Sequence, residues 1–255
     1  MKILVDQLGH YLKQNEYNIQ SYGLMHGKMG LVIFFYHLGK YSGKMEFSDY
    51  ASELLDQILQ RINPNMTIDF ENGIAGIGWG IEYLIQNNFV EGDADEILEE
   101  LDTLIGNQLI FGCEDPIVVK SIGYYYISRL QYRVDDDEND VVLELKYFVI
   151  LLIDELERQI EYMADDPELG YLLNELYKLN IFNYKILKLK QKNRGSEHLF
   201  LLPGILKSSE TEMMHIENLI SSSEIKSFID QLARDNKWGL KNGIAGMGLQ
   251  IILMQ

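Results

Sequence analysis

The sequence has little cysteine and little proline. Among 255 residues, one is cysteine, Cys113, and four are proline. A single cysteine excludes an intrachain disulfide and any metal site built from several cysteines. With so few prolines and no tract rich in Ser, Gly and Pro, the sequence offers no candidate linker between domains. We therefore interpret residues 1–255 as one domain, long enough to bury a sizeable core.

Positive charge and long apolar runs are also scarce. The chain has 22 Lys and Arg against 39 Asp and Glu, a formal net charge of −17. Such a chain repels a phosphate backbone, so nucleic acid is not an expected partner. The longest strongly apolar run, residues 147–153, is far too short to cross a bilayer, and Asp6 interrupts the N-terminal segment before it could serve as a signal sequence. The sequence predicts a cytoplasmic protein without membrane insertion.

What the sequence does contain is a glycine motif that recurs. DFENGIAGIGWGIEYLIQ (residues 69–86) returns as NGIAGMGLQIIL (residues 242–253) and, more loosely, as HGKMGLVIFFYHL (residues 26–38). Each copy places two glycines three residues apart at the start of an apolar run, namely Gly27 and Gly30, Gly73 and Gly76, and Gly243 and Gly246. Such a repeat predicts an array of similar structural units.

The glycines also indicate how these units pack. Each glycine inside a helix costs about 0.5–1 kcal/mol relative to alanine, so a helix with several of them needs a compensating contact. Positions 73, 76 and 80 share one helix face, which would let a neighbouring helix come close. We interpret each copy as the start of an inner helix.

More polar, amphipathic segments alternate with the glycine-led ones. Residues 47–62 carry one apolar stripe with Ser48 placed to cap the helix, Asp93 announces a second such helix, and residues 141–162 form a third. Residues 199–206 are interpreted as a truncated fifth unit, and residues 210–219 and 223–234 as outer-helix segments.

The spacing of the units suggests a closed arrangement. Gly76, Gly123 and Gly170 lie 47 residues apart, and the first and last units carry the same motif. An open solenoid would have polar end repeats unlike the interior ones. The pattern predicts an all-α fold, an α/α toroid of about six helical hairpins in which the last inner helix lies beside the first.

The motif segments YGLMHGKMGL (residues 22–31), NGIAGIGWGI (72–81) and WGLKNGIAGMG (238–248) resemble the lanthionine synthetase C-like family, which contains the cyclases of lantibiotic maturation. The resemblance covers the first ninety residues and the last fifteen, and the middle by spacing alone. It implies the α/α-toroid fold and a place in a peptide-modification pathway.

The resemblance also implies a test for cyclase chemistry. Family members with this activity hold zinc through two cysteines and a histidine, the latter two within Cys-His-Gly, and the zinc prepares a peptide thiol to attack a dehydrated residue. This sequence contains no Cys-His-Gly, and Cys113 stands alone in Phe-Gly-Cys-Glu. We therefore expect no metal site and no cofactor, zinc included.

Candidate catalytic residues lie near the first two motifs. His26 can serve as a general base or ligand, or as a helix-start residue that satisfies backbone donors. Asp69, Glu71 and Glu82 surround the second motif, and α/α toroids also occur among glycosidases that use paired carboxylates. In an acidic chain the same residues can serve only for capping and solvation.

Candidate binding residues are aromatic. Trp79, Trp238 and Tyr124, the first of three consecutive tyrosines, can line a cleft that stacks on a sugar or peptide, although aromatics at helical spacing are more often core. The one basic stretch, residues 185–194, can dock an acidic leader peptide or balance neighbouring charges.

Together these observations favour a protein of this family that lacks the zinc site and binds a peptide or protein partner within a peptide-modification pathway. Two alternatives stay open. One is an enzyme that uses carboxylates in the toroid's cleft to act on a glycan or peptide. The other is a divergent cyclase with a reduced metal site.

Overall fold

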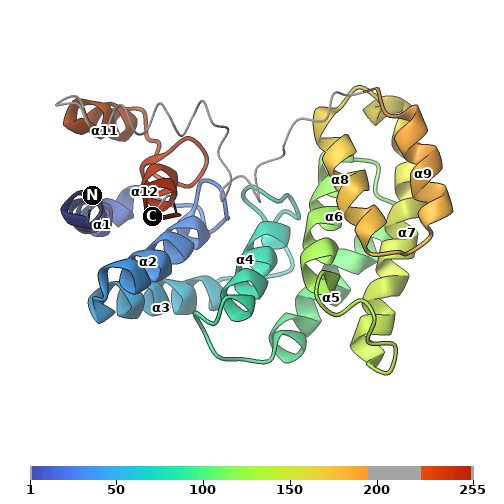
Figure 1. Ribbon diagram of the computed structural model, residues 1–255, viewed down its shortest axis with the longest axis horizontal. Helices are drawn as coiled ribbons and strands as arrows, with labels where there is room; N and C mark the ends of the chain where they lie inside the picture. The colour runs from blue at the N-terminus through green and yellow to red at the C-terminus, as the bar shows by residue number, and fades with distance from the viewer. Residues whose placement is uncertain (1, 195–224, 254–255) are drawn as a thin grey trace. The chain divides into compact units, whose positions relative to one another are not determined.

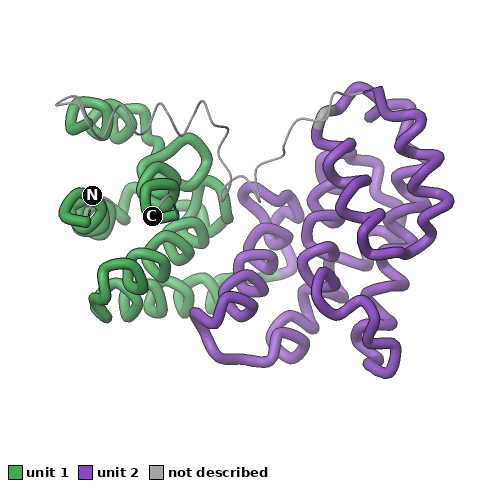
Figure 2. The backbone as a smooth tube through the Cα atoms, viewed as in Figure 1, with its two compact units in different colours: residues 1–63, 201–255 green, residues 64–200 purple. Residues whose placement is uncertain are grey.

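The computed structural model describes residues 2–194 and 225–253, and every regular element within these ranges is a helix (Figure 1). The all-α prediction is confirmed. The chain forms two compact units, unit 1 with residues 1–63 and 201–255, and unit 2 with residues 64–200 (Figure 2). The segments predicted at 199–206 and 210–219 lie outside the described residues. Within the described ranges, no helix is both long and apolar enough to cross a membrane.

Unit 1 contains the first and last glycine-led helices. Its elements are α1 (Lys2–Asn15), η1 (Glu16–Asn18), α2 (Lys28–Ser42), α3 (Met45–Leu59), α11 (Ile225–Arg234) and α12 (Ile244–Leu253). Helix α2 is buried around most of its circumference, whereas α3 buries a single stripe that includes Phe47, Leu54 and Ile58. Helix α12 packs against α2 and α1, so the last inner helix lies beside the first, as predicted.

Unit 2 is built from three successive helical hairpins. Its elements are α4 (Ile74–Gln86), α5 (Ala94–Ile110), α6 (Pro116–Leu130), α7 (Asp140–Met163), α8 (Pro167–Lys178) and α9 (Asn183–Lys192). Helices α4, α6 and α8 pack in one row, and α5, α7 and α9 pack in a second row that covers it. The predicted alternation of inner and outer helices is confirmed in this unit.

The predicted repeat spacing reappears as packing between inner helices. A Cβ at Gly78 in α4 would lie 2.6 Å from the ring of Tyr125 in α6, and one at Gly123 would lie 2.7 Å from a methyl carbon of Leu172 in α8. The small residue of one inner helix thus accommodates a large side chain of the next, and Gly78 and Tyr125 are 47 residues apart.

The glycine-led helices α2, α4 and α12 begin in the same way. The chain folds back so that the first helical N–H donates to a carbonyl seven residues earlier, Lys28 to Ser21 at 2.9 Å, Ile74 to Thr67 at 2.8 Å and Ile244 to Lys237 at 3.0 Å. These bonds satisfy N–H groups that a helix start otherwise leaves open. We call residues 21–27, 67–73 and 237–243 the glycine turns.

The glycine turns correct the expected role of the motif. A Cβ at Gly27 would lie 2.6 Å from the carbonyl oxygen of Gly23, and one at Gly73 would lie 2.6 Å from that of Asp69. A Cβ at Gly243 would overlap the carbonyl of Gly239 in the same manner. The first motif glycine therefore makes room for its own preceding turn and not for a neighbouring helix. Because the glycine turn occupies residues 237–243, the last helix begins at Ile244 and not at Asn242, where the repeated segment starts.

Most of the remaining helices of unit 2 start with a side-chain cap. Asp93 accepts a hydrogen bond from Asp95 N at 2.9 Å, which confirms the predicted cap of α5. Asp115 accepts from Ile117 N at 2.9 Å, and Asp166 from Glu168 N at 2.8 Å. The predicted Ser48 cap is wrong, because α3 begins at Met45 in unit 1 and Ser48 lies within its first turn.

Candidate functional site

The largest buried polar network in the described residues centres on Arg129 of α6, whose side chain is fully buried. Its Nη1 lies 2.6 Å from Glu82 Oε2 on α4. Its Nη2 lies 2.7 Å from Asp102 Oδ2 and 2.9 Å from Asp95 Oδ1, both on α5. One guanidinium therefore joins three helices, and its donors are directed at three carboxylates.

The electrostatics of this network suit a structural role. Burial disfavours the charge of Arg129, but Asp102 outweighs this and holds the pKa of Arg129 above its ordinary value. Burial also acts to raise the pKa of Asp95, yet hydrogen bonds from Arg133 and Arg129 hold that pKa below its usual range. Burial raises the pKa of Asp102 despite its hydrogen bonds from Arg129. The hydroxyl of Tyr125 also donates to Asp102 Oδ1 at 2.6 Å, so the carboxylate is shielded on several sides.

This network accounts for Glu82, one of the predicted catalytic residues. Glu82 is buried, with one carboxylate oxygen bound to Arg129 and the other accepting from Gln86 Nε2 at 2.8 Å. Both oxygens are therefore engaged, and the ion pair between Glu82 and Arg129 joins α4 to α6.

Asp69 and Glu71 lie in the glycine turn that precedes α4. Asp69 Oδ1 accepts from Asn72 N at 2.7 Å, and Oδ2 accepts from Thr67 Oγ1 at 2.6 Å, so this side chain shapes the turn. Glu82 lies eight residues beyond the start of α4, roughly 12 Å along the helix axis. The structure thus separates Glu82 from the other two carboxylates.

The starts of α4, α6 and α8 are joined by a second polar group. Lys120 Nζ lies 2.6 Å from Asp166 Oδ2 and 2.5 Å from Glu168 Oε2. Burial lowers the pKa of Lys120, but the two carboxylates outweigh it and the net pKa is raised, so the ammonium stays charged. Ser121 Oγ accepts from Phe70 N at 2.9 Å and ties the glycine turn of α4 to α6.

Beside this ion pair runs a chain of aromatic rings, which we call the aromatic cluster: Phe70, Trp79, Tyr83, Tyr124 and Tyr171. The Phe70 ring lies 6.1 Å from that of Trp79 and 5.5 Å from that of Tyr124, so the structure brings the two predicted binding residues together. Trp79 stacks on Tyr83 at 5.2 Å, and Tyr124 lies 6.4 Å from Tyr171. Burial raises the pKa of Tyr83 to about 12, so its hydroxyl stays neutral. Trp79, Tyr83 and Tyr171 are partly exposed and offer ring surface to a ligand.

The remaining predicted residues, His26 and Trp238, belong to unit 1. Trp238 is buried, its ring stacks on Tyr11 at 6.0 Å, and its Nε1 donates to Asn236 Oδ1 at 2.8 Å. His26 is exposed in the glycine turn that precedes α2. A shared cleft of Trp238 with Trp79 and Tyr124 stays a prediction, as does a catalytic role for His26.

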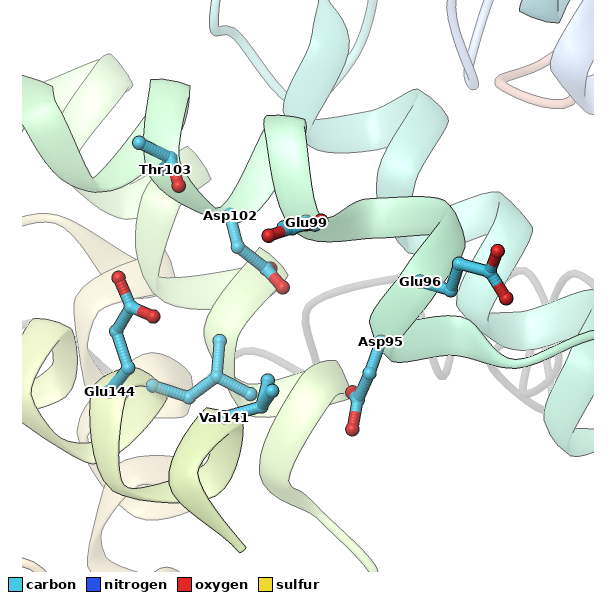
Figure 3. A pocket seen from close by; sticks show the side chains of 8 residues that line it. Asp95, Glu96, Glu99, Asp102, Thr103, Val141 and Glu144 are labelled. Carbon is cyan, nitrogen blue, oxygen red and sulfur yellow. The ribbon is translucent and has the colours of Figure 1, made fainter.

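A cavity of about 530 Å³ lies between α5 and α7 (Figure 3). Asp95 and Asp102 on its wall are bound to Arg129. Glu96, Glu99 and Glu144 also line it, and in the described part of the chain their carboxylates have no ion-pair or hydrogen-bond partner. Positive charge would suit this cavity, yet no group of three or more metal-ligating side chains there or elsewhere in the described ranges has a geometry that could hold a metal ion.

Cys113 precedes α6 and does not resemble a zinc ligand. Its thiol is directed at Asp115 O, 3.7 Å away, and its carbonyl accepts from Gln159 Nε2 at 2.5 Å. Burial, assisted by the charge of Asp115, raises the pKa of the thiol, whereas a zinc ligand must be a thiolate. The residues present therefore do not fit a zinc held by two cysteines and a histidine.

Comparison with known proteins identifies the family. The model of lanthionine synthetase C-like proteins matches residues 3–166. The chain belongs to the lanthionine synthetase C-like family. The match runs from α1 into the turn before α8, so it includes the middle repeats that resemble the family in the sequence by spacing alone. The family fold is an α/α toroid and the family acts on peptides. No curated protein and no solved structure matches the chain.

Sequence reasoning missed Arg129 and Lys120, although the sequence places residues of opposite charge about one repeat away from each of them. Arg129 is an isolated charge in the apolar run of α6, and it follows Glu82 by 47 residues, the spacing of Gly76 and Gly123. Residues one repeat apart occupy equivalent positions on adjacent inner helices, so opposite charges at that spacing predict an ion pair. Lys120 follows the same logic, because Asp166 and Glu168 lie 46 and 48 residues further on.

Proposed function

We propose that this protein is a peptide-binding member of the lanthionine synthetase C-like family that works without the family's zinc, as a component of a ribosomal-peptide modification pathway. The donor set carries this proposal. The single cysteine is buried beside Asp115 with a raised pKa, and the sequence contains no Cys-His-Gly. This donor set does not supply the two cysteines and one histidine with which family cyclases hold the zinc that lowers the pKa of a substrate thiol.

The aromatic cluster supports peptide binding. Trp79, Tyr83 and Tyr171 offer partly exposed rings beside the charged group of Lys120, Asp166 and Glu168. Rigid aromatic rings give large contact areas at low entropic cost and anchor many peptide interfaces. The starts of α2, α4 and α12 do not offer their first N–H group to a phosphate, because the glycine turns already use it.

A carboxylate-dependent enzyme that acts on a glycan or peptide is the alternative. Such chemistry needs one carboxylic acid and one free carboxylate across the scissile bond. Glu82 is bound to Arg129, and Asp166 and Glu168 are bound to Lys120, so these carboxylates are engaged in ion pairs. Single Asp69→Asn, Glu71→Gln and Glu82→Gln variants, screened on oligosaccharides and peptides, test this alternative. Loss of a measurable hydrolase activity in one of them would establish it.

The main experiment incubates the purified chain with a dehydrated peptide that carries one cysteine, with and without added zinc. We expect binding by calorimetry, no thioether ring by mass spectrometry, and far less than one zinc per chain by metal analysis. A Trp79→Ala, Tyr83→Ala variant should weaken the binding, while Tyr132→Ala, an exposed ring outside the aromatic cluster, should not. One tightly held zinc per chain together with ring formation would instead make the protein a divergent cyclase.

A further inference from the structure

The cations of helix α9 and of the two residues after it fall into two groups. Three of them pair with carboxylates on α7 or in the turn after it: Lys185 with Asp154 and Glu157, Lys192 with Glu161, and Arg194 with Asp165. The sequence left open whether residues 185–194 dock an acidic peptide or balance neighbouring charges. For these three cations, the structure favours charge balance.

Lys188 and Lys190 form the second group. Within the described residues neither has a carboxylate partner, and each ammonium lies over an aromatic ring instead. Lys188 Nζ is 5.9 Å from the ring centre of Tyr184, and Lys190 Nζ is 5.4 Å from that of Tyr177. A lysine held over an exposed ring keeps its charge available to an incoming carboxylate.

The same surface exposes large apolar side chains. Phe182, Tyr184 and Leu187 are 40%, 58% and 45% exposed, while Ile186 and Leu189 form the buried side of α9. Phe182 also adopts the left-handed conformation, with φ of 50°, which is unfavourable for a residue other than glycine or asparagine. Such backbone strain is commonly retained where a side chain must be presented. We call Phe182, Tyr184, Leu187, Lys188 and Lys190 the α9 surface.

We propose that the α9 surface docks a peptide segment that combines carboxylates with large apolar side chains. Lys188 and Lys190 receive the carboxylates, and Phe182, Tyr184 and Leu187 contact the apolar groups. The inference deepens the proposed function and rests on it, because it assigns the chemistry of the partner.

Neighbouring charges favour a peptide over a flat anionic partner. Asp154, Glu157 and Glu161 on α7 remain 48% to 73% exposed although they pair with α9. A membrane or a nucleic acid would bring many negative charges against these carboxylates, in a chain whose net charge is already −17. A narrow peptide can reach Lys188 and Lys190 without covering α7.

The test measures fluorescence anisotropy of a labelled synthetic peptide in which Glu alternates with Phe and Leu, titrated with the full chain. A matched peptide with Gln in place of Glu isolates the contribution of charge. We expect the Glu peptide to bind more tightly than the Gln peptide. The Lys188→Gln, Lys190→Gln variant should weaken binding of the Glu peptide by about fivefold, the loss expected for exposed ion pairs. Tyr184→Ser should weaken both peptides.

Lys192→Gln is the control, because it removes one positive charge from the same helix at a lysine already bound to Glu161. It should change binding of the Glu peptide by less than about twofold. Equal losses in the Lys192→Gln and Lys188→Gln, Lys190→Gln variants, equal binding of the two peptides, or binding to phosphatidylserine vesicles through the same lysines would each overturn the inference.

The outcome also separates this inference from the proposed function. If the Glu peptide fails to bind while the dehydrated cysteine peptide binds through Trp79 and Tyr83, the α9 inference falls and the proposed function stands. If neither peptide binds, both fall.

Discussion

The two compact units bury different kinds of side chain. Among the described residues, unit 1 buries one polar side chain, Ser42, beside a core of aliphatic and aromatic groups. Unit 2 buries five charged residues and three uncharged polar ones. These are Glu82, Asp102, Lys120, Ser121, Ser128, Arg129, Glu155 and Gln159.

This difference shows two ways of holding inner helices in position, although the helices have a similar sequence pattern. In unit 1, α2 and α12 are positioned by apolar packing and by glycine turns, which satisfy the helix starts with backbone alone. In unit 2, α4 has a glycine turn, whereas α6 and α8 begin with aspartate caps and are joined by ion pairs. Apolar packing tolerates small shifts, whereas a buried guanidinium with three carboxylates specifies one arrangement.

The chain offers a separate reporter for each unit, because its two tryptophans are divided between them, Trp238 in unit 1 and Trp79 in unit 2. A Trp238→Phe background follows unit 2 by fluorescence, and a Trp79→Phe background follows unit 1. Each prediction below uses this pair of backgrounds.

The largest expected effect comes from Arg129→Met. It leaves Glu82 and Asp102 buried without their cation, and removing one partner of a buried ion pair typically costs about 3–5 kcal/mol. Urea denaturation followed by Trp79 should show this loss, while the transition followed by Trp238 stays within about 0.5 kcal/mol of wild type. A loss below about 1 kcal/mol followed by Trp79 would contradict the role assigned to Arg129. Adding Glu82→Leu and Asp102→Leu should recover part of the stability, since no buried charge then remains unpaired.

The next effect tests the glycine turns, which both units share. Gly73→Ala in unit 2 and Gly243→Ala in unit 1 should each cost about 2–3 kcal/mol, because the new Cβ meets backbone carbonyls that cannot move aside. Gly123→Ala is the control, since its Cβ would meet a methyl group of Leu172, which can rotate. If Gly123→Ala proves as costly as the other two, helix approach and not the turn would explain the motif.

The smallest effect is a difference in pH dependence between the units. Burial, assisted by Lys40, lowers the pKa of His37 in α2 from 6.5 to about 4. Between these values the unfolded chain takes up a proton that the folded chain refuses, so unit 1 loses stability as the pH falls from 6.5 to 4. We expect a loss of about 2 kcal/mol, after allowance for the partial exposure of His37.

Unit 2 should respond over a lower pH range. Arg133 and Arg129 hold the pKa of Asp95 below its ordinary value of 3.8, so the stabilisation from Asp95 persists down to that value and is lost only as the pH falls further. Denaturation at pH 7, 5, 4 and 3 in both tryptophan backgrounds measures the two ranges. His37→Gln should remove the slope of unit 1 alone, and a slope that survives this substitution would refute the assignment.

The sequence predicted the helices of unit 2 well because their signals are local. The glycine motif placed α4, the apolar period placed α5 and α7, and Asp93 was identified as a cap, since a cap depends on residues within one turn. Ser48 was misassigned because residues ahead of it, from Met45, already continue the helix. The site was predicted less well. Trp79 and Tyr124 do share one aromatic cluster, but their connection through Phe70 depends on a turn whose path the sequence does not reveal.

By itself the sequence determined the helical alternation, the 47-residue repeat and the lack of a second cysteine, because each is a property of composition or of neighbours along the chain. Only the tertiary structure decided what the motif glycines face, that Glu82 is bound to Arg129, and which lysines of α9 have no carboxylate partner among the described residues. The physical reason is the distance along the chain over which each interaction acts. Backbone periodicity acts over a few residues, whereas an ion pair or a close approach exists only after packing has brought distant segments together.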